Sequence, residues 1–154
     1  MENKTIKTKE RITALLILML ILGFAWYSHT NLVKIKTGVI EGSLSYPSDV
    51  IPENMVVCAE DIFTKKQLCT NYHIKSSKYK YNIGYKIDAP VGDYYVFAKD
   101  ISSTHDLKDH VAYYSDFVTC GMNINNCHSH NPIRVAVIYG ETTKNINPWD
   151  WYNY

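Results

Sequence analysis

The sequence predicts an all-β protein, an antiparallel β-sandwich of about seven strands preceded by one N-terminal transmembrane helix. Three observations predict this class. A charge-free apolar run occupies residues 12–28 of the 154-residue chain. Beyond it, short segments of alternating apolar and polar residues are separated by turn signals over residues 38–146, and no segment has the periodicity of an amphipathic helix. About 125 residues follow the apolar run, enough for one domain with its own core.

The apolar run has the composition of a membrane anchor. A spanning helix needs about 20 apolar residues, and this run lies at the short end of the usual range. Four basic residues in the first 11 positions orient the N-terminus toward the cytoplasm, and Trp26 and Tyr27 fall where interfacial aromatic residues lie. We therefore expect a cytoplasmic stub at 1–11, a signal-anchor at 12–28 and a linker at 29–37.

A cleaved secretory signal is the alternative interpretation of the same run. Gly23 and Ala25 place small residues at the −3 and −1 positions of a cleavage after Ala25, which would release a secreted protein. Two aromatic residues follow this position at once, and the apolar run is longer than the usual signal core. The anchor is therefore the preferred interpretation.

The charge balance argues against a nucleic-acid partner. The whole chain carries 16 basic and 15 acidic residues. Beyond the stub, 12 Lys and Arg residues stand against 13 Asp and Glu residues, a net charge of −1. Such a balance lacks the basic footprint that phosphate backbones require.

All four cysteines, Cys58, Cys69, Cys120 and Cys127, follow the apolar run. An even number of cysteines outside the cytoplasm indicates two disulfides, for which three pairings exist. Proximity in sequence favours Cys58 with Cys69 and Cys120 with Cys127. Each of these short loops would contribute about 2–3 kcal/mol on the chain-entropy model.

The strand pattern runs through the domain in order. Alternation is clearest in residues 79–87, where four Tyr and Ile residues follow Tyr79 at every second position. Turn signals include Pro47-Ser48-Asp49 and residues 89–93, and residues 100–110 form a polar loop. The expected strands are 38–47, 55–59, 68–74, 79–87, 94–99, 111–119, 133–139 and 142–146.

Three of these segments resemble the motifs of carboxypeptidase regulatory-like domains. Residues 38–42 (GVIEG) resemble the G-x-[IV]-x-G start, residues 90–98 (PVGDYYVFA) the middle P-x-G-x-Y-x-[VF]-x-A strand, and residues 135–142 (VAVIYGET) the closing V-x-V-x-x-G-x-T hairpin. The resemblance implies a prealbumin-like (transthyretin-like) sandwich. That family has no shared catalytic residues, and its members serve as accessory modules, structural supports, and protein- or sugar-contacting domains. The four cysteines and the long 100–110 loop depart from its pattern.

The residues themselves also argue against catalysis. A Gly-x-Ser-x-Gly elbow is missing from the sequence, and an even cysteine count leaves no spare thiol nucleophile. The acids Asp100, Asp106, Asp109 and Asp116 match no EF-hand loop. We therefore expect neither an enzyme nor a cofactor.

A metal site is the sharpest chemical alternative. Cys120, Cys127, His128 and His130 bring soft sulfur and imidazole nitrogen together within eleven residues, ligands that suit zinc or copper. The gap between the two cysteines is wider than in zinc fingers, and an oxidising compartment favours a disulfide there.

The C-terminal segment, residues 147–154, carries four aromatic residues, Trp149, Trp151, Tyr152 and Tyr154. Three interpretations stay open. The segment packs back on the sandwich as a cap, exposes its rings to a protein partner, or stacks them on sugar rings.

These observations predict a membrane-anchored, non-enzymatic interaction or structural module of a cell-envelope assembly, with the domain at 38–146 on the periplasmic or cell-surface side. A carbohydrate- or wall-polymer-binding module is the first alternative. A metal-binding accessory protein is the second. The expected partners are the membrane, an envelope protein and, in the first alternative, a glycan.

Overall fold

The computed structural model describes residues 13, 15–24, 26, 35–101 and 110–153. The predicted stub, the cleavage position after Ala25, most of the 29–37 linker, most of the 100–110 loop and Tyr154 lie outside the described residues. The chain divides into two compact units, Met1–Ile35 and Lys36–Tyr154, each described by itself. In the first unit, residues 15–24 are helical.

Within the part of the chain that the structure describes, we find no helix with both the length and the hydropathy that a membrane crossing needs.

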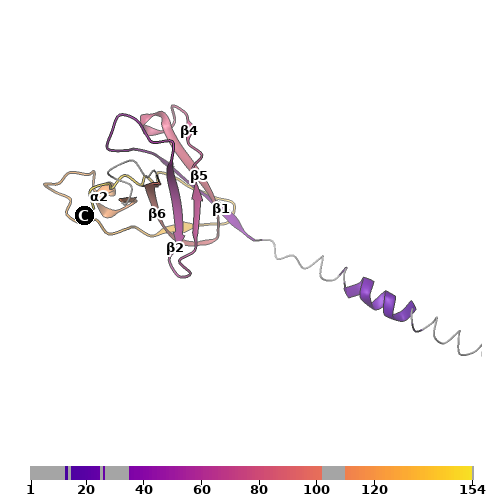
Figure 1. The fold of residues 1–154 in the computed structure, drawn as a ribbon. Coiled ribbons are helices and arrows are strands. Elements are labelled where there is room, and N and C mark those ends of the chain that lie inside the picture. The colour runs from indigo at the N-terminus through magenta and orange to yellow at the C-terminus, as the bar shows by residue number, and fades with distance from the viewer. Residues whose placement is uncertain (1–12, 14, 25, 27–34, 102–109, 154) are drawn as a thin grey trace, which may run out of the picture. The chain divides into compact units, whose positions relative to one another are not determined.

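The second unit consists mostly of β-structure in two sheets (Figure 1). The first sheet has the strand order β4-β5-β1-β9. Strands β1 and β5 form its centre and pair antiparallel over seven residues. The bounds of its strands are β1 Thr37–Ser43, β4 Ile74–Lys75, β5 Ile83–Pro90 and β9 Thr142–Thr143.

The second sheet has the order β3-β2-β6-β7, and β8 also pairs with β6. Its centre is the antiparallel pair of β2 and β6. The bounds are β2 Met55–Asp61, β3 Gln67–Thr70, β6 Gly92–Asp100, β7 Val111–Tyr113 and β8 Val135–Val137. Two short helical segments complete the elements of the second unit: the 3-10 helix η1 at Lys80–Asn82 and α2 at Asp116–Thr119.

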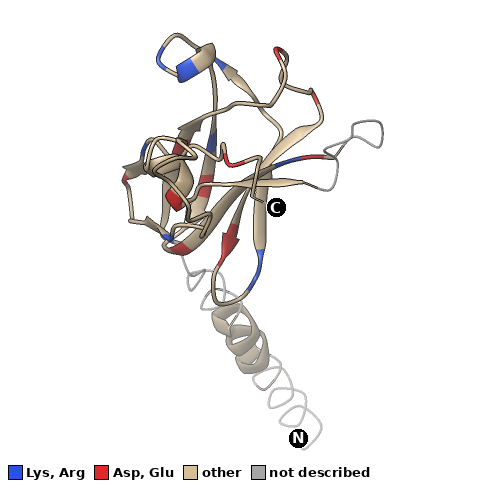
Figure 2. Cartoon of the chain, turned by 90° about the vertical axis from the view of Figure 1, so that its left-hand side faces the viewer, with Lys and Arg blue, Asp and Glu red and all other residues tan. Residues whose placement is uncertain are grey.

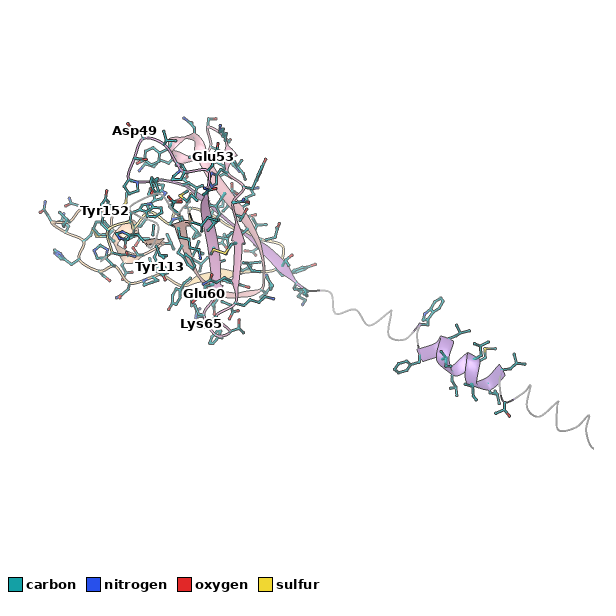
Figure 3. All side chains as sticks on the ribbon, in the orientation of Figure 1. Asp49, Glu53, Glu60, Lys65, Tyr113 and Tyr152 are labelled. Carbon is teal, nitrogen blue, oxygen red and sulfur yellow. A yellow bond between two sulfur atoms is a disulfide. The ribbon has the colours of Figure 1, made fainter. Side chains whose placement is uncertain are left out.

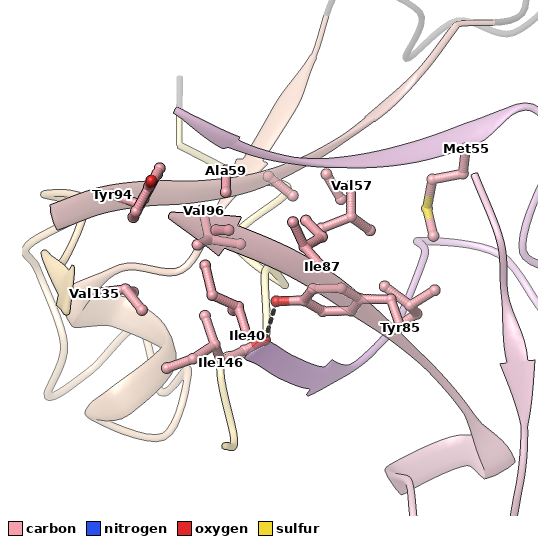
Figure 4. Packing of buried hydrophobic residues seen from close by; sticks show 14 of the residues in the cluster. Ile40, Met55, Val57, Ala59, Tyr85, Ile87, Tyr94, Val96, Val135 and Ile146 are labelled. Atoms are coloured by element: carbon pink, nitrogen blue, oxygen red, sulfur yellow. Dashed lines mark hydrogen bonds between the residues drawn. The ribbon is translucent and has the colours of Figure 1, made fainter. Parts of the chain in front are cut away.

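The core lies between the two sheets because side chains alternate along each strand (Figure 4). Ile40 of β1 and Ile87 of β5 contribute from the first sheet, and Val57 of β2 and Val96 of β6 from the second. Burying one such side chain stabilises the fold by about 1.5–3 kcal/mol. Burial raises the pKa of Tyr85 well above its ordinary value, so this phenol stays neutral and donates to the Ile146 carbonyl at 2.7 Å.

Gly42 allows the C-terminal part of the chain to approach β1. A Cβ atom at this position would lie 1.7 Å from the carbonyl oxygen of Ile146 and 3.0 Å from the ring of Tyr85. The backbone of Ile146 instead donates to the Glu41 carbonyl at 3.2 Å. Only a residue without a side chain fits here, so the glycine of the predicted opening motif has a packing role.

The predicted all-β class is confirmed, and four details of the strand prediction need correction. Among the described residues, nine strands form in place of about seven. Strand β9 pairs parallel to β1, because the chain crosses from β8 to the other sheet and turns at Gly140, which has a φ of 74°. Residues 80–82 form a 3-10 turn in which Tyr81 has a φ of 61°. Residues 116–119 are helical, with Asp116 as an acidic residue in the first turn, and Ser115 occupies the N-cap position without a side-chain cap hydrogen bond.

The two predicted disulfides form, with the pairing that proximity favours. Cys58 and Cys69 face each other across β2 and β3, and their Cα atoms are 4.0 Å apart. Cys120 and Cys127 close the loop that follows α2. The first disulfide fixes an edge strand, and the second fixes a loop without regular structure.

Charged side chains of both signs are scattered over the strands and loops of the described chain (Figure 2). Charge alone therefore does not single out one face of the second unit. A groove lined by the ends of several elements distinguishes one end of the unit.

Candidate ligand-binding groove

A groove of about 1100 Å³ lies at one end of the sandwich. Three parts of the chain form it: the loop between β1 and β2, the segment from His73 to Ile83, and the C-terminal aromatic segment. Met122 of the Cys120–Cys127 loop adds an apolar contact. The lining residues are 44–51, 53, 73, 75–77, 81–83, 122, 149, 151 and 152.

Two tryptophans form the inner wall of this groove. Trp149 and Trp151 are 8% and 2% exposed, and their indole nitrogens donate to the carbonyls of Ser43 at 2.9 Å and Ser45 at 3.0 Å. The ring of Tyr46 meets that of Trp151 edge to face at 5.0 Å between centroids. Buried indoles with satisfied N–H groups make a fixed wall rather than an exposed platform.

Tyr81 stands at the rim of the groove. Its side chain is 61% exposed, and its ring centroid lies 5.9 Å from that of Trp149. Tyr81 and Asn82 both have left-handed backbone conformations, with φ of 61° and 58°. Such a conformation is unfavourable for a bulky side chain, and it turns this tyrosine out of the strand pattern toward solvent.

Lys80 lies close to both of these rings. Its ammonium lies 4.8 Å from the ring centroid of Trp149 and 5.5 Å from that of Tyr81, within cation–π distance. Lys80 itself is not among the residues that line the groove.

Carboxylates lie on the opposite loop. Figure 3 shows Asp49 and Glu53 on the loop between β1 and β2, and Tyr152 on the C-terminal segment. Both acids are exposed, and both line the groove. Lys75 of β4 is the lining residue of opposite charge. His73 adds no free donor on its Nε2 side, because this nitrogen is 2.8 Å from the Met55 carbonyl.

A second polar cluster holds the C-terminal segment through Asp150. Asp150 is fully buried, and Ser115 donates to its Oδ2 atom at 2.5 Å. Nδ1 of His130 lies 2.9 Å from both carboxylate oxygens, and the imidazole stacks on Phe117 at 4.6 Å. The serine hydroxyl bonds to the carboxylate and not to the imidazole, so these three residues do not form a nucleophile and its base. They tie the segment to α2.

A third cluster lies on the outer side of β1. Glu41 is buried, accepts hydrogen bonds from Lys78 and from Tyr79, and has the Lys86 ammonium 3.9 Å away. Burial alone would raise the pKa of Glu41, but the hydrogen bonds and the two ammonium groups outweigh it and hold this pKa below its ordinary value. The cluster fixes the turn before β5, from which Tyr81 projects.

The four residues of the predicted metal alternative do not come together as ligands. The sulfur atoms of Cys120 and Cys127 are bonded to each other, which removes both thiolates. His128 is exposed, and His130 is bound to Asp150. Among the described residues, no group of three or more His, Cys, Asp and Glu side chains has the arrangement of a metal site.

The residues of the predicted interaction surface have different environments. Trp149 and Trp151 pack inside the domain, as the capping interpretation requires, while Tyr152 is 58% exposed and lines the groove. Sequence reasoning missed Tyr81, Asp49 and Glu53 as groove residues. The alternation over 79–87 hid Tyr81 in a predicted strand, and Asp49 was interpreted only as part of a turn.

No family model matches this chain, and neither does any curated protein. Among solved structures it is similar to a leucine-rich repeat protein from Bacteroides thetaiotaomicron, with a TM-score of 0.38 and 14% sequence identity. The likeness covers 77% of this chain and 14% of that chain. A TM-score this low does not define a shared fold, so the architecture rests on the chain's own residues.

Proposed function

We propose that this protein is a membrane-anchored, non-enzymatic interaction module of a cell-envelope assembly, which holds its partner in the groove at the end of the sandwich. In this proposal, residues 12–28 anchor the chain and a prealbumin-like domain lies on the periplasmic or cell-surface side. Cleavage near Ala25, which would release the domain, is the alternative for the anchor.

The groove is the observation that carries this proposal. Its inner wall is fixed by two buried indoles, and Tyr81 and Tyr152 add exposed rings beside it. Fixed apolar walls with a few polar groups are typical of binding sites. The two disulfides support a place outside the cytoplasm, because cytosolic thiols stay reduced.

Site-specific photocrosslinking in intact cells tests the proposal. The full chain carries a benzophenone amino acid at position 152 in the groove or, as the matched control, in place of the exposed Tyr139, which does not line the groove. We expect covalent adducts from position 152 only, recovered in the membrane fraction, on a full-length chain whose four cysteines resist alkylation.

Three outcomes would contradict the proposal: a chain absent from the membrane fraction, reactive thiols, or equal adduct formation from both positions. If the recovered chain begins at Trp26, the protein is the secreted form and not the anchored one.

A further inference from the structure

We propose that the groove binds a neutral sugar chain, with Tyr81 as the stacking ring and with Asp49 and Glu53 as acceptors for sugar hydroxyls. This inference rests on the proposed function, because it names the ligand class of the same groove. Three properties of the groove carry it: an exposed ring held in place, polar groups in the same lining, and a balance of charge.

The ring of Tyr81 is held for stacking. The ring of Trp149 lies 5.9 Å away between centroids in a tilted arrangement, and the Lys80 ammonium is within cation–π distance of both rings. The faces of a pyranose ring carry C–H groups, and the negative face of an aromatic ring attracts such weakly positive hydrogens. Because the wall is ordered before a ligand arrives, binding costs little conformational entropy there.

The polar groups match a ligand that carries hydroxyls. Asp49 and Glu53 offer carboxylate oxygens from one loop, and Asn82 and Ser77 offer an amide and a hydroxyl from another. Carboxylates accept two hydrogen bonds readily, and such charge-assisted bonds are about twice as strong as neutral ones. A saturated hydrocarbon or a bare aromatic ligand would form no hydrogen bonds with these groups.

The charge of the groove favours a neutral ligand. Asp49 and Glu53 would repel a phosphate or carboxylate polymer, while Lys75 in the lining and Lys80 beside it would repel a cationic peptide. The volume of about 1100 Å³ lies at the upper end of small-ligand sites, which favours several linked sugar rings over one.

Calorimetric titration of the full chain in lipid nanodiscs tests this inference, since maltoside detergents are themselves sugars. The probes are chitotetraose, cellotetraose, maltotetraose and mannotetraose. Together they cover α and β glycosidic linkages and sugars with and without an N-acetyl group. The key variants are Tyr81→Asn, which removes the ring but keeps a residue that tolerates the left-handed backbone, and Asp49→Asn with Glu53→Gln. Tyr72→Asn is the matched control, because Tyr72 is 72% exposed and lies outside the groove lining.

We expect at least one probe to bind, Tyr81→Asn and the double carboxylate variant to weaken it by about tenfold each, and Tyr72→Asn to leave it unchanged. Unfolding curves that match the parent show that a variant is folded. If no probe binds, or if Tyr81→Asn and Tyr72→Asn weaken binding equally, the sugar inference is wrong. The proposed function survives that result when the crosslinks from position 152 lead to a protein instead.

Discussion

Asp150 is the residue through which the C-terminal segment makes its buried carboxylate contacts. Its carboxylate is fully buried and accepts from Ser115 at 2.5 Å, with Nδ1 of His130 2.9 Å away. A buried carboxylate is tolerable only when it is paired and hydrogen-bonded, and here both conditions hold. The cluster stabilises the fold, because loss of the Asp150 carboxylate would leave both Ser115 and His130 without this partner.

We expect Asp150→Ala to lower the free energy of unfolding by about 1–3 kcal/mol, because Ser115 loses its acceptor inside the fold. The midpoint of urea unfolding of the full chain in nanodiscs measures this loss. Asp93→Ala is the matched control, since Asp93 pairs with Arg134 at 3.3 Å near the surface, where an ion pair contributes at most about 1 kcal/mol. Equal losses in the two variants would show that the buried cluster has no special role.

Elements with a clean pattern could be predicted from the sequence, and elements fixed by distant contacts could not. The strand-length segments that became β2 and β6 and the short cysteine spacings are local signals, and both predictions are confirmed. The turn at Tyr81 interrupts an alternation that continues on both sides of it. Parallel pairing of β9 depends on Gly140 and on contacts with β1 that lie about 100 positions away. The groove was missed for the same reason, because it joins three separated segments.

The contacts of Glu41, which join β1 to the turn before β5, make the stability of the fold depend on pH. The lowered pKa of Glu41 means that the folded protein holds this group as a carboxylate more readily than the unfolded chain, whose ordinary value is 4.5. The stabilisation is therefore fully present above pH 4.5 and is lost as the pH falls through the lowered pKa. Tyr79, Lys78 and Lys86 are the groups that face this carboxylate.

Glu41→Gln should remove this contribution and flatten the acid limb of the stability profile. Urea midpoints measured from pH 7 down to pH 3 on parent and variant give the comparison. The parent should lose more stability than the variant below pH 4.5, and Glu141→Gln, on an exposed residue, should follow the parent. Parallel curves for parent and Glu41→Gln would rule out the ion cluster as a source of acid sensitivity.

At the scale of the whole molecule, the C-terminal segment joins the two sheets. Trp151 donates to the Ser45 carbonyl just beyond β1, and the backbone of the neighbouring Asp150 donates to the Tyr113 carbonyl of β7 at 3.3 Å. The segment thus closes one end of the sandwich and at the same time builds the inner wall of the groove. Folding and binding share these residues, so a loss of binding in a tryptophan variant would say nothing about ligand contact by itself.

Trp151→Ala and Tyr152→Ala separate the two roles of this segment. Trp151→Ala empties a fully packed position and should lower the free energy of unfolding by about 3–5 kcal/mol. Tyr152→Ala changes an exposed ring and should stay within about 0.5 kcal/mol of the parent. Urea unfolding of both variants provides the measurement. Similar free energies of unfolding for the two variants would mean that the segment is peripheral and that the fold does not fix the wall of the groove. A much lower value for Trp151→Ala than for Tyr152→Ala would mean that position 152 can be changed to probe partner contact without unfolding the domain.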